Sequence, residues 1–174
     1  MMEATKMEND TLSETGKAAL AYAERGWLVF PTYGIKRDGG CECGEVDCKS
    51  PGKHPRTKNG FEAATNDPKQ VEAWWKRWPN ANIGLRTGPE NGIWVADIDV
   101  KGGGIATWDK LLRGHGQTQP FATPRTQTGS GGQHVIFAWS EGVPSKADQI
   151  GPGVDTRGDR GYIVAPPSLH ESGK

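Results

Sequence analysis

The segment at residues 39–56 most constrains how this chain folds, because it carries metal-binding side chains and almost no apolar surface. Three cysteines and a histidine lie there in the pattern Cys41-x-Cys43-x4-Cys48-x5-His54, with Val46 as the lone aliphatic side chain. Burial cannot order such a segment, so we expect a bound ion to hold it. Three thiolates and one imidazole match a closed, structural, tetrahedral Zn²⁺ site. The alternative is a set of free cysteines beside an unrelated histidine.

Charge and hydropathy exclude two classes of protein. The 174 residues include 21 basic and 21 acidic side chains, so the net charge is zero and the chain is not a basic nucleic-acid coat. No apolar run approaches the roughly 18–20 residues that a membrane helix needs, and residues 1–10 are polar and lack a hydrophobic signal core. We therefore expect a cytoplasmic protein without a membrane partner, with a disordered lead at residues 1–10 and one domain at residues 11–174.

Hydrophobic periodicity and capping residues predict a mixture of helices and strands. We expect helices over 12–25, 67–78 and 103–113, and strands over 27–30, 82–86, 93–97, 123–128, 134–139 and 162–165. The strand at 27–30 should be closed by Pro31. This order indicates an α+β fold and not a regular βαβ winding. Most of the seven tryptophans lie at helical spacing or beside strands and are predicted to be core, whereas His115 and His170 are predicted to lie on the surface.

Asp97 and Asp99 form the first candidate site, at the end of a predicted strand. Residues two apart on a strand share a face, about 6–7 Å from one another. Two carboxylates at that separation repel by roughly 2–3 kcal/mol at an effective dielectric of 20. A divalent cation with a preference for oxygen ligands, Mg²⁺ or Mn²⁺, removes that penalty. The alternative is a solvated strand end with two acidic side chains.

Two further segments carry groups suited to phosphate. The turn from Thr128 to His134 is rich in glycine, which allows backbone N–H groups to approach a phosphate, and Ser130 adds a hydroxyl donor. It lacks the Walker pattern. In the segment 153–161, Asp155 is a candidate third carboxylate and Arg157 a candidate phosphate clamp. The alternatives are a glycine-rich hairpin with a satisfied histidine and a polar hairpin between strands.

Taken together, these motifs resemble the bifunctional primase–polymerase (Prim-Pol) domain of the archaeo-eukaryotic primase superfamily, found in phage and plasmid replication proteins. The resemblance covers roughly residues 15–170. It rests on the order of Ala21-Tyr22, Gly26-Trp-Leu-Val-Phe-Pro31, Pro51-Gly-Lys-His-Pro55, Ile83-Gly-Leu-Arg-Thr-Gly88, Asp97-Ile-Asp99, Ser130-Gly-Gly-Gln-His134, Val154-Asp-Thr-Arg-Gly158 and Ala165-Pro-Pro-Ser168.

The resemblance implies a primase-like catalytic core with mixed or antiparallel sheets, flanking helices, an RRM-like catalytic part and a zinc-binding insertion at 39–56. It implies a DNA primase and DNA polymerase that uses two Mg²⁺ or Mn²⁺ ions, nucleoside triphosphates, and a single-stranded DNA template with its primer. The implied roles are catalytic metal binding by Asp97, Asp99 and Asp155, nucleotide contact by Ser130 and His134, triphosphate or template contact by Lys53 and Arg157, and structural zinc binding by Cys41, Cys43, Cys48 and His54.

Relatives usually continue into a helicase or an accessory region, so we expect this chain to be a fragment of a larger replication protein. If the chain is phage-encoded, it would act in the host cytoplasm. One alternative is a catalytically silent, zinc-bearing module that binds nucleic acid, with tryptophans that stack on bases. Another is a metal-dependent nuclease, which also uses clustered aspartates but does not explain the Ser-Gly-Gly-x-His loop.

Overall fold

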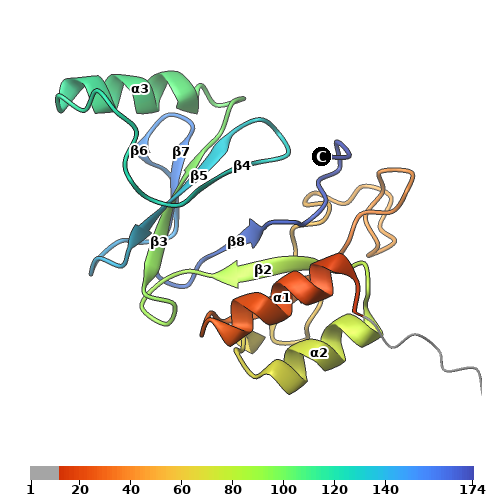
Figure 1. Ribbon diagram of the computed structural model, residues 1–174. Helices are drawn as coiled ribbons and strands as arrows, with labels where there is room; N and C mark the ends of the chain where they lie inside the picture. The colour runs from red at the N-terminus through yellow and green to blue at the C-terminus, as the bar shows by residue number, and fades with distance from the viewer. Residues whose placement is uncertain (1–11) are drawn as a thin grey trace, which may run out of the picture.

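Two antiparallel sheets form the framework of the chain in a computed structural model that describes residues 12–174 (Figure 1). The smaller sheet has the order β1-β2-β8 and the larger has the order β4-β5-β3-β7-β6. The mixture of helices and antiparallel sheets confirms the predicted α+β class, while the predicted lead at 1–10 lies outside the described residues. The strands are β1 (Val29–Thr32), β2 (Asn82–Arg86), β3 (Ile93–Ile98), β4 (Arg125–Gln127), β5 (Gln133–Ala138), β6 (Lys146–Gly151), β7 (Val154–Arg157) and β8 (Tyr162–Ala165).

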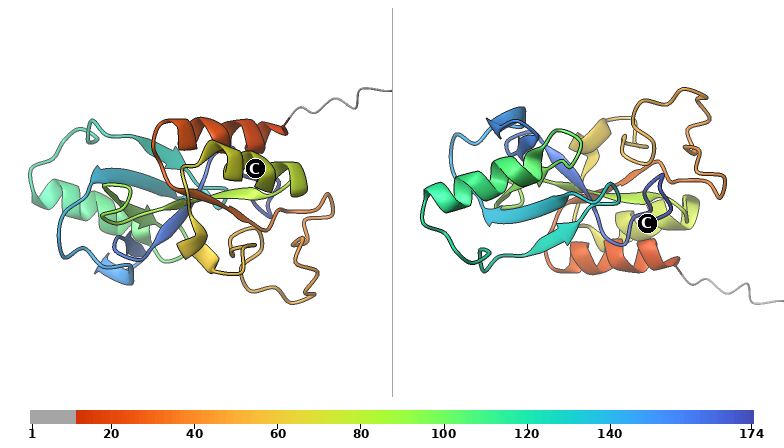
Figure 2. Two further views of the ribbon diagram at one scale, coloured as in Figure 1. Left: turned by 90° about the horizontal axis from the view of Figure 1, so that it is seen from below. Right: turned by 90° about the horizontal axis from the view of Figure 1, so that it is seen from above.

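Three helices cover the outer faces of these sheets. Helices α1 (Glu14–Glu24) and α2 (Pro68–Arg77) pack together against the small sheet, α3 (Gly104–Gly114) packs on the larger one, and a 3₁₀ turn, η1, spans Gly60–Ala63 (Figures 1 and 2). The predicted start of α2 is confirmed, because the Asp67 side chain accepts a hydrogen bond from the Lys69 N–H and Pro68 follows as the first helical residue. None of the helices in the described chain has the length and hydrophobicity that crossing a bilayer requires.

The core alternates across β3 and thereby orients the first candidate site. Val95 belongs to the apolar cluster shared with α1, α2 and the small sheet, whereas Ala96 and Ile98 belong to the cluster beneath α3. Asp97 lies two residues from Val95, so its side chain points to the side of the small sheet. The prediction for the tryptophans is met fully by Trp75, which is 1% exposed; the others described as packing on the core are half-buried.

The sequence predicts the end of one strand wrongly and leaves two strands out. Strand β1 does not end before Pro31 but runs through it to Thr32. Proline is tolerated there because β1 is an edge strand that pairs only with β2 in its sheet. The polar segments of β6 and β7 were not recognised as strands. In β7 the buried alternate positions are Val154 and Thr156, so a polar residue type occupies a core position and hides the alternation.

Candidate active site

A cavity of about 930 Å³ lies between the two sheets, and it gathers the predicted site residues. Its walls come from β3, β4, β5, β6 and β7 on one side and from β2, β8 and the segment 50–53 on the other. The predicted residues that line it are Lys53, Asp97, Asp99, Ser130, His134, Asp155 and Arg157. Residues separated by as many as 104 positions in the chain, from Lys53 to Arg157, thus reach one space.

Three of these side chains occupy one row across adjacent strands. Asp97 on β3 is paired with His134 on β5 and with Asp155 on β7. Directly opposite residues on antiparallel strands hold their Cβ atoms about 4.5–5.5 Å apart on the same face. Asp99 follows the end of β3, is exposed, and accepts a hydrogen bond from the Lys101 N–H through Oδ1. The register therefore sets two carboxylates and an imidazole side by side, with a third carboxylate at the rim.

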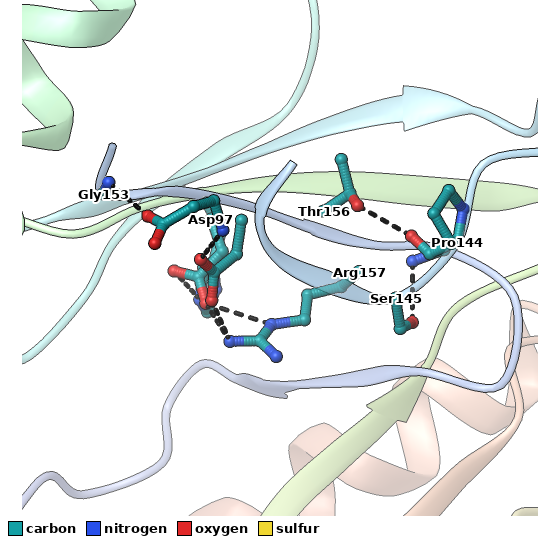
Figure 3. Close-up of polar contacts among 10 residues, drawn as sticks. Asp97, Pro144, Ser145, Gly153, Thr156 and Arg157 are labelled. Atoms are coloured by element: carbon teal, nitrogen blue, oxygen red, sulfur yellow. Dashed lines mark hydrogen bonds and ion pairs between the residues drawn. The ribbon is translucent and has the colours of Figure 1, made fainter. Parts of the chain in front are cut away.

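Arg157 is paired with the facing carboxylates (Figure 3). Its Nη2 lies 3.0 Å from Asp97 Oδ2 and 2.9 Å from Asp155 Oδ2, and its Nε donates to Asp97 at 3.2 Å. Burial alone would raise the pKa of Asp97, but the contact with His134 and the Arg157 guanidinium outweigh it and hold that pKa below its ordinary value. The guanidinium for which the sequence predicts a phosphate contact thus offsets part of the negative charge of the carboxylate pair in this structure.

His134 is buried, and one of its two ring nitrogens has no hydrogen-bond partner in the described residues. Its Nε2 lies 3.4 Å from Asp97 Oδ1, whereas its buried Nδ1 has no hydrogen-bond partner in the described part of the chain. An unpaired buried nitrogen costs free energy that a bound ligand can recover. The ring lines the cavity, and its buried Nδ1 is a polar atom that this structure leaves unsatisfied.

The glycine-rich turn between β4 and β5 comes close to the end of β3. A Cβ on Gly132 would lie 2.2 Å from the carbonyl oxygen of Ile98, so only glycine fits there. The turn is closed by the Thr128 N–H, which donates to the Gly132 carbonyl, and Thr128 Oγ1 lies 3.0 Å from Ser130 Oγ. Ser130 is exposed at the cavity, where its hydroxyl is available to a ligand.

The predicted zinc ligands meet in a single group. The ligand atoms of Cys41, Cys43, Cys48 and His54 all lie within 4.8 Å of one another. His54 Nε2 is 3.4 Å from Cys41 Sγ and 3.5 Å from Cys48 Sγ. Tetrahedral Zn²⁺ has bonds of about 2.3 Å to sulfur and about 2.0–2.1 Å to nitrogen, which place a sulfur ligand and a nitrogen ligand about 3.6 Å apart. The arrangement fits zinc, and Val46 in the same loop is 99% exposed, so burial does not order it.

The pKa values of the Cys41 and Cys43 thiols also favour a bound cation. Burial opposes ionisation of Cys41, but backbone N–H groups of Cys43 and Gly52 and the His54 ring together lower its pKa to about 7. A backbone N–H at Glu45 favours the Cys43 thiolate, yet burial and the two neighbouring sulfur atoms raise its pKa to about 11. One thiol therefore ionises readily, and the next ionises only with a cation to offset the accumulated negative charge.

Side-chain hydrogen bonds join the Cys/His loop to the cavity. The Gly52 carbonyl accepts from Asn82 Nδ2 and from Thr32 Oγ1, both at 3.0 Å, and the Tyr162 hydroxyl donates to the Lys53 carbonyl at 3.0 Å. Asn82 is 2% exposed. These bonds fix the backbone on both sides of the Lys53 side chain at the cavity wall.

The cavity also holds residues for which the sequence predicts no role at the site, among them Asn82, Asp148 and His170. Asp148 lies in β6, which was not recognised; its N–H donates to Asp155 Oδ1, and its own carboxylate accepts from the Gly153 N–H. His170 was predicted on the surface, but its side chain is 16% exposed and lines the cavity. No spacing rule identifies them, since tertiary folding alone brings them to the site.

The carboxylates offer the hard oxygen ligands that Mg²⁺ and Mn²⁺ prefer. Within residues 12–174, the Cys/His group is the one set of three or more ligand atoms that all lie within 4.8 Å, so the three aspartates stand farther apart. Arg157 lies between two of them and supplies a positive charge at that place. The donor set and its demand for a cation fit divalent metal binding.

A search of curated protein sequences found no match. The family model described as "Bifunctional DNA primase/polymerase, N-terminal" matches residues 19–174, which include both sheets, the Cys/His loop and all the cavity residues named above. The chain therefore belongs to the family of bifunctional DNA primase/polymerase N-terminal domains.

Proposed function

We propose that this chain is a template-dependent nucleotidyltransferase, a DNA primase and polymerase that extends or starts a primer on single-stranded DNA. Its family supports a primase/polymerase type of nucleotidyltransferase in general. The observation that carries the proposal is the row of His134, Asp97 and Asp155 across three strands, facing a cavity that also holds Ser130 and Lys53.

Asp97, Asp99 and Asp155 are the residues that would hold the catalytic ions. Two divalent ions at such carboxylates would activate the attacking 3′-hydroxyl and neutralise the triphosphate and the leaving pyrophosphate. Asp148 supports the site as a positioning residue, because its backbone N–H holds the Asp155 carboxylate at 2.9 Å.

The chain's own polar groups would bind and orient the nucleotide. His134 contacts Asp97 through Nε2, and its ring lines the cavity, where it would contact a phosphate or sugar of the nucleotide. Ser130 offers a hydroxyl donor from the glycine-rich turn, and Lys53 brings an ammonium group from the opposite wall. Arg157 is able to contact the triphosphate when the aspartates bind cations in its place, since a guanidinium pairs with phosphate as well as with carboxylate.

We propose a structural role for zinc at Cys41, Cys43, Cys48 and His54. Their geometry suits the ion, and the loop has no apolar core to replace it. The expected partners are a DNA template with its primer and nucleoside triphosphates, at the site of DNA replication in the cell.

Primer extension tests the proposal. The chain is given single-stranded template, an annealed primer, labelled nucleotides and Mg²⁺ or Mn²⁺. We expect Asp97→Asn to reduce extension at least about a hundredfold, since the metal site supplies several kcal/mol of charge stabilisation. Asp159→Asn is the matched control, because Asp159 is exposed and near Asp155 in sequence but does not line the cavity.

The same experiment separates the alternative functions. Template binding without synthesis, in every metal tested, would support a catalytically silent zinc-bearing module, in which Arg157 permanently occupies the carboxylate pair. Shortening of the template that depends on Asp97 would support a nuclease. Either result would overturn the proposed function.

A further inference from the structure

The segment at residues 168–174 crosses from the small sheet to the glycine-rich turn. The Asn82 amide holds both backbone groups of Leu169, with Nδ2 donating to its carbonyl at 2.8 Å and Oδ1 accepting from its N–H at 2.9 Å. Ser168 Oγ accepts from the Ile83 N–H at 2.8 Å. The His170 N–H then donates to the Lys174 carbonyl at 2.8 Å and closes a turn. The backbone that carries His170 is therefore fixed at several points.

The His170 ring is oriented by Ser172. Its Nδ1 lies 3.0 Å from Ser172 Oγ and 3.1 Å from the Ser172 backbone nitrogen. Because a backbone N–H can only donate, we assign Nδ1 as the acceptor, and in the neutral ring the proton then resides on Nε2. The nearest carboxylate oxygen, Oε1 of Glu171, lies 3.9 Å from Nε2, beyond hydrogen-bonding distance. The ring lines the cavity with a donor that Glu171 does not satisfy.

The same ring packs against the turn that carries Ser130. A Cβ on Gly129 would fall 2.2 Å from His170 Cβ, and Ser172 Oγ donates to the Gly129 carbonyl at 3.0 Å. Glycine at 129 is what allows this approach. His170 and the Ser130 turn thus form one continuous wall of the cavity.

Two positive charges, Lys53 and Lys101, act on His170 against one carboxylate, that of Glu171. Burial lowers the pKa of His170, and Lys53 and Lys101 lower it further, while Glu171 opposes them. The ring is therefore neutral at pH 7 and acts as a hydrogen-bond donor, and its cationic neighbours supply the charge. An N–H donor that shares a cavity wall with the Lys53 ammonium group is suited to phosphate oxygens.

We infer that His170, together with Lys53, forms a phosphate-binding subsite in the cavity wall, separate from the row of His134, Asp97 and Asp155. The subsite rests on the proposed function for its ligand: the phosphate belongs either to the incoming nucleoside triphosphate or to the backbone of the nucleic acid. His170 binds the phosphate through Nε2–H, and Asn82 and Ser172 are positioning residues that hold its backbone and ring.

A pair of isosteric substitutions tests the role of Nε2. Asparagine places a polar atom near the position of Nδ1 and lacks a donor at Nε2, whereas glutamine carries an amide nitrogen near the position of Nε2. Affinities of the full chain are measured for deoxyadenosine triphosphate, deoxyadenosine and a single-stranded oligothymidylate, with Mg²⁺ present. His115→Asn is the matched control, because His115 is an exposed histidine at the end of α3.

We expect His170→Asn to weaken phosphate binding about tenfold, the value of one hydrogen bond to a charged group, while His170→Gln retains most of it. Weaker triphosphate binding with unchanged deoxyadenosine binding assigns the subsite to the nucleotide; weaker oligothymidylate binding alone assigns it to nucleic acid. Lys53→Gln should reduce the same affinity, and Lys110→Gln on the exposed face of α3 should not.

The subsite is overturned if His170→Asn leaves the affinities for triphosphate and oligothymidylate unchanged. It is also overturned if His170→Gln lowers these affinities as much as His170→Asn does, because the ring would then act only through packing. A wild-type chain that binds neither phosphate-bearing ligand also overturns it. A chain that binds triphosphate through His170 but never extends a primer would overturn the proposed function and leave the subsite standing.

Discussion

Arg157 supplies the cavity with a cation that belongs to the chain itself. Like charges directly opposite on neighbouring strands are destabilising, and Asp97 and Asp155 are such a pair. The guanidinium bridges both carboxylates, whose side chains are 23% and 24% exposed. Arg157 therefore offsets part of this repulsion, and divalent ions bound at the proposed metal site would exchange one cation for others.

This exchange predicts an unusual response to Arg157→Gln. In chelator, the variant should lose about 1–3 kcal/mol of unfolding free energy, because two facing carboxylates lose the cation that they share. Mg²⁺ or Mn²⁺ should then raise its thermal midpoint more than that of the wild type. Thermal unfolding with and without metal measures both effects.

Arg160→Gln is the control for this prediction, since Arg160 pairs with Glu62 through side chains that are 67% and 52% exposed. Exposed pairs contribute about 0–1 kcal/mol. If metal stabilises wild type and Arg157→Gln equally, Arg157 does not compete for the metal site.

For individual residues, the sequence predicts which side chains share a site but not which side chains they pair with. All seven predicted cavity residues line one space, and their individual roles stay predictions. Arg157 was assigned to phosphate because its pairing with Asp97 depends on the register of β7, a strand that was not recognised. His170 was placed on the surface because its burial comes from packing against Gly129, far away in sequence.

Strands and helices were predictable where local chemistry is strong. The Asp67-Pro68 start of α2 and the apolar strands β2, β3, β5 and β8 were predicted near their observed bounds. Strand β6 was not, because most of its residues are exposed and polar. The pairing of β1 with β2 shows a constraint that no pattern reveals: Phe30 lies opposite Gly84, and its fully buried ring covers the space where a Cβ would stand.

Gly84→Ala should therefore destabilise the small sheet. The added Cβ would lie 2.3 Å from the Phe30 ring, which also packs edge-on against Tyr162 at a centroid distance of 5.2 Å and cannot yield. We expect a loss of about 1–3 kcal/mol in denaturant unfolding. Gly114→Ala, in open space at the end of α3, should instead gain about 0.5 kcal/mol. A neutral Gly84→Ala would show that the ring has room to shift.

For the molecule as a whole, the Cys/His loop and the cavity are mechanically linked. Asn82 connects Gly52 in that loop with Leu169 in the last segment. Both of these residues line the cavity. The sequence predicted the ligand set of the loop from spacing alone. It contained no sign of this buried amide, because asparagine at the start of a strand has no periodic signature.

Removing one ligand should loosen the loop and leave the rest folded. We expect wild type to carry one zinc per chain and Cys48→Ser to carry less, with proteolysis in Cys48→Ser beginning within residues 39–56. The aspartates should still bind Mg²⁺ or Mn²⁺. The hydrogen bonds described above join the loop to β1, β2 and β8, whereas Asp97 and Asp155 lie on β3 and β7. Asp47→Asn, exposed in the same loop, is the control. Full zinc content in Cys48→Ser would show that the ligand set is wrong.

The row of His134, Asp97 and Asp155 exists only in one register of the larger sheet. A shift of β7 by one residue against β3 would turn Asp155 to the opposite face, toward the apolar cluster beneath α3, and bring Val154 or Thr156 to the cavity. The irregular pairing of the larger sheet lies farther out, between Lys146 and Gly151 of β6. On the proposed function, a misregistered chain would be compact but inactive, so activity would require the pairing of β7 with β3 seen in this structure.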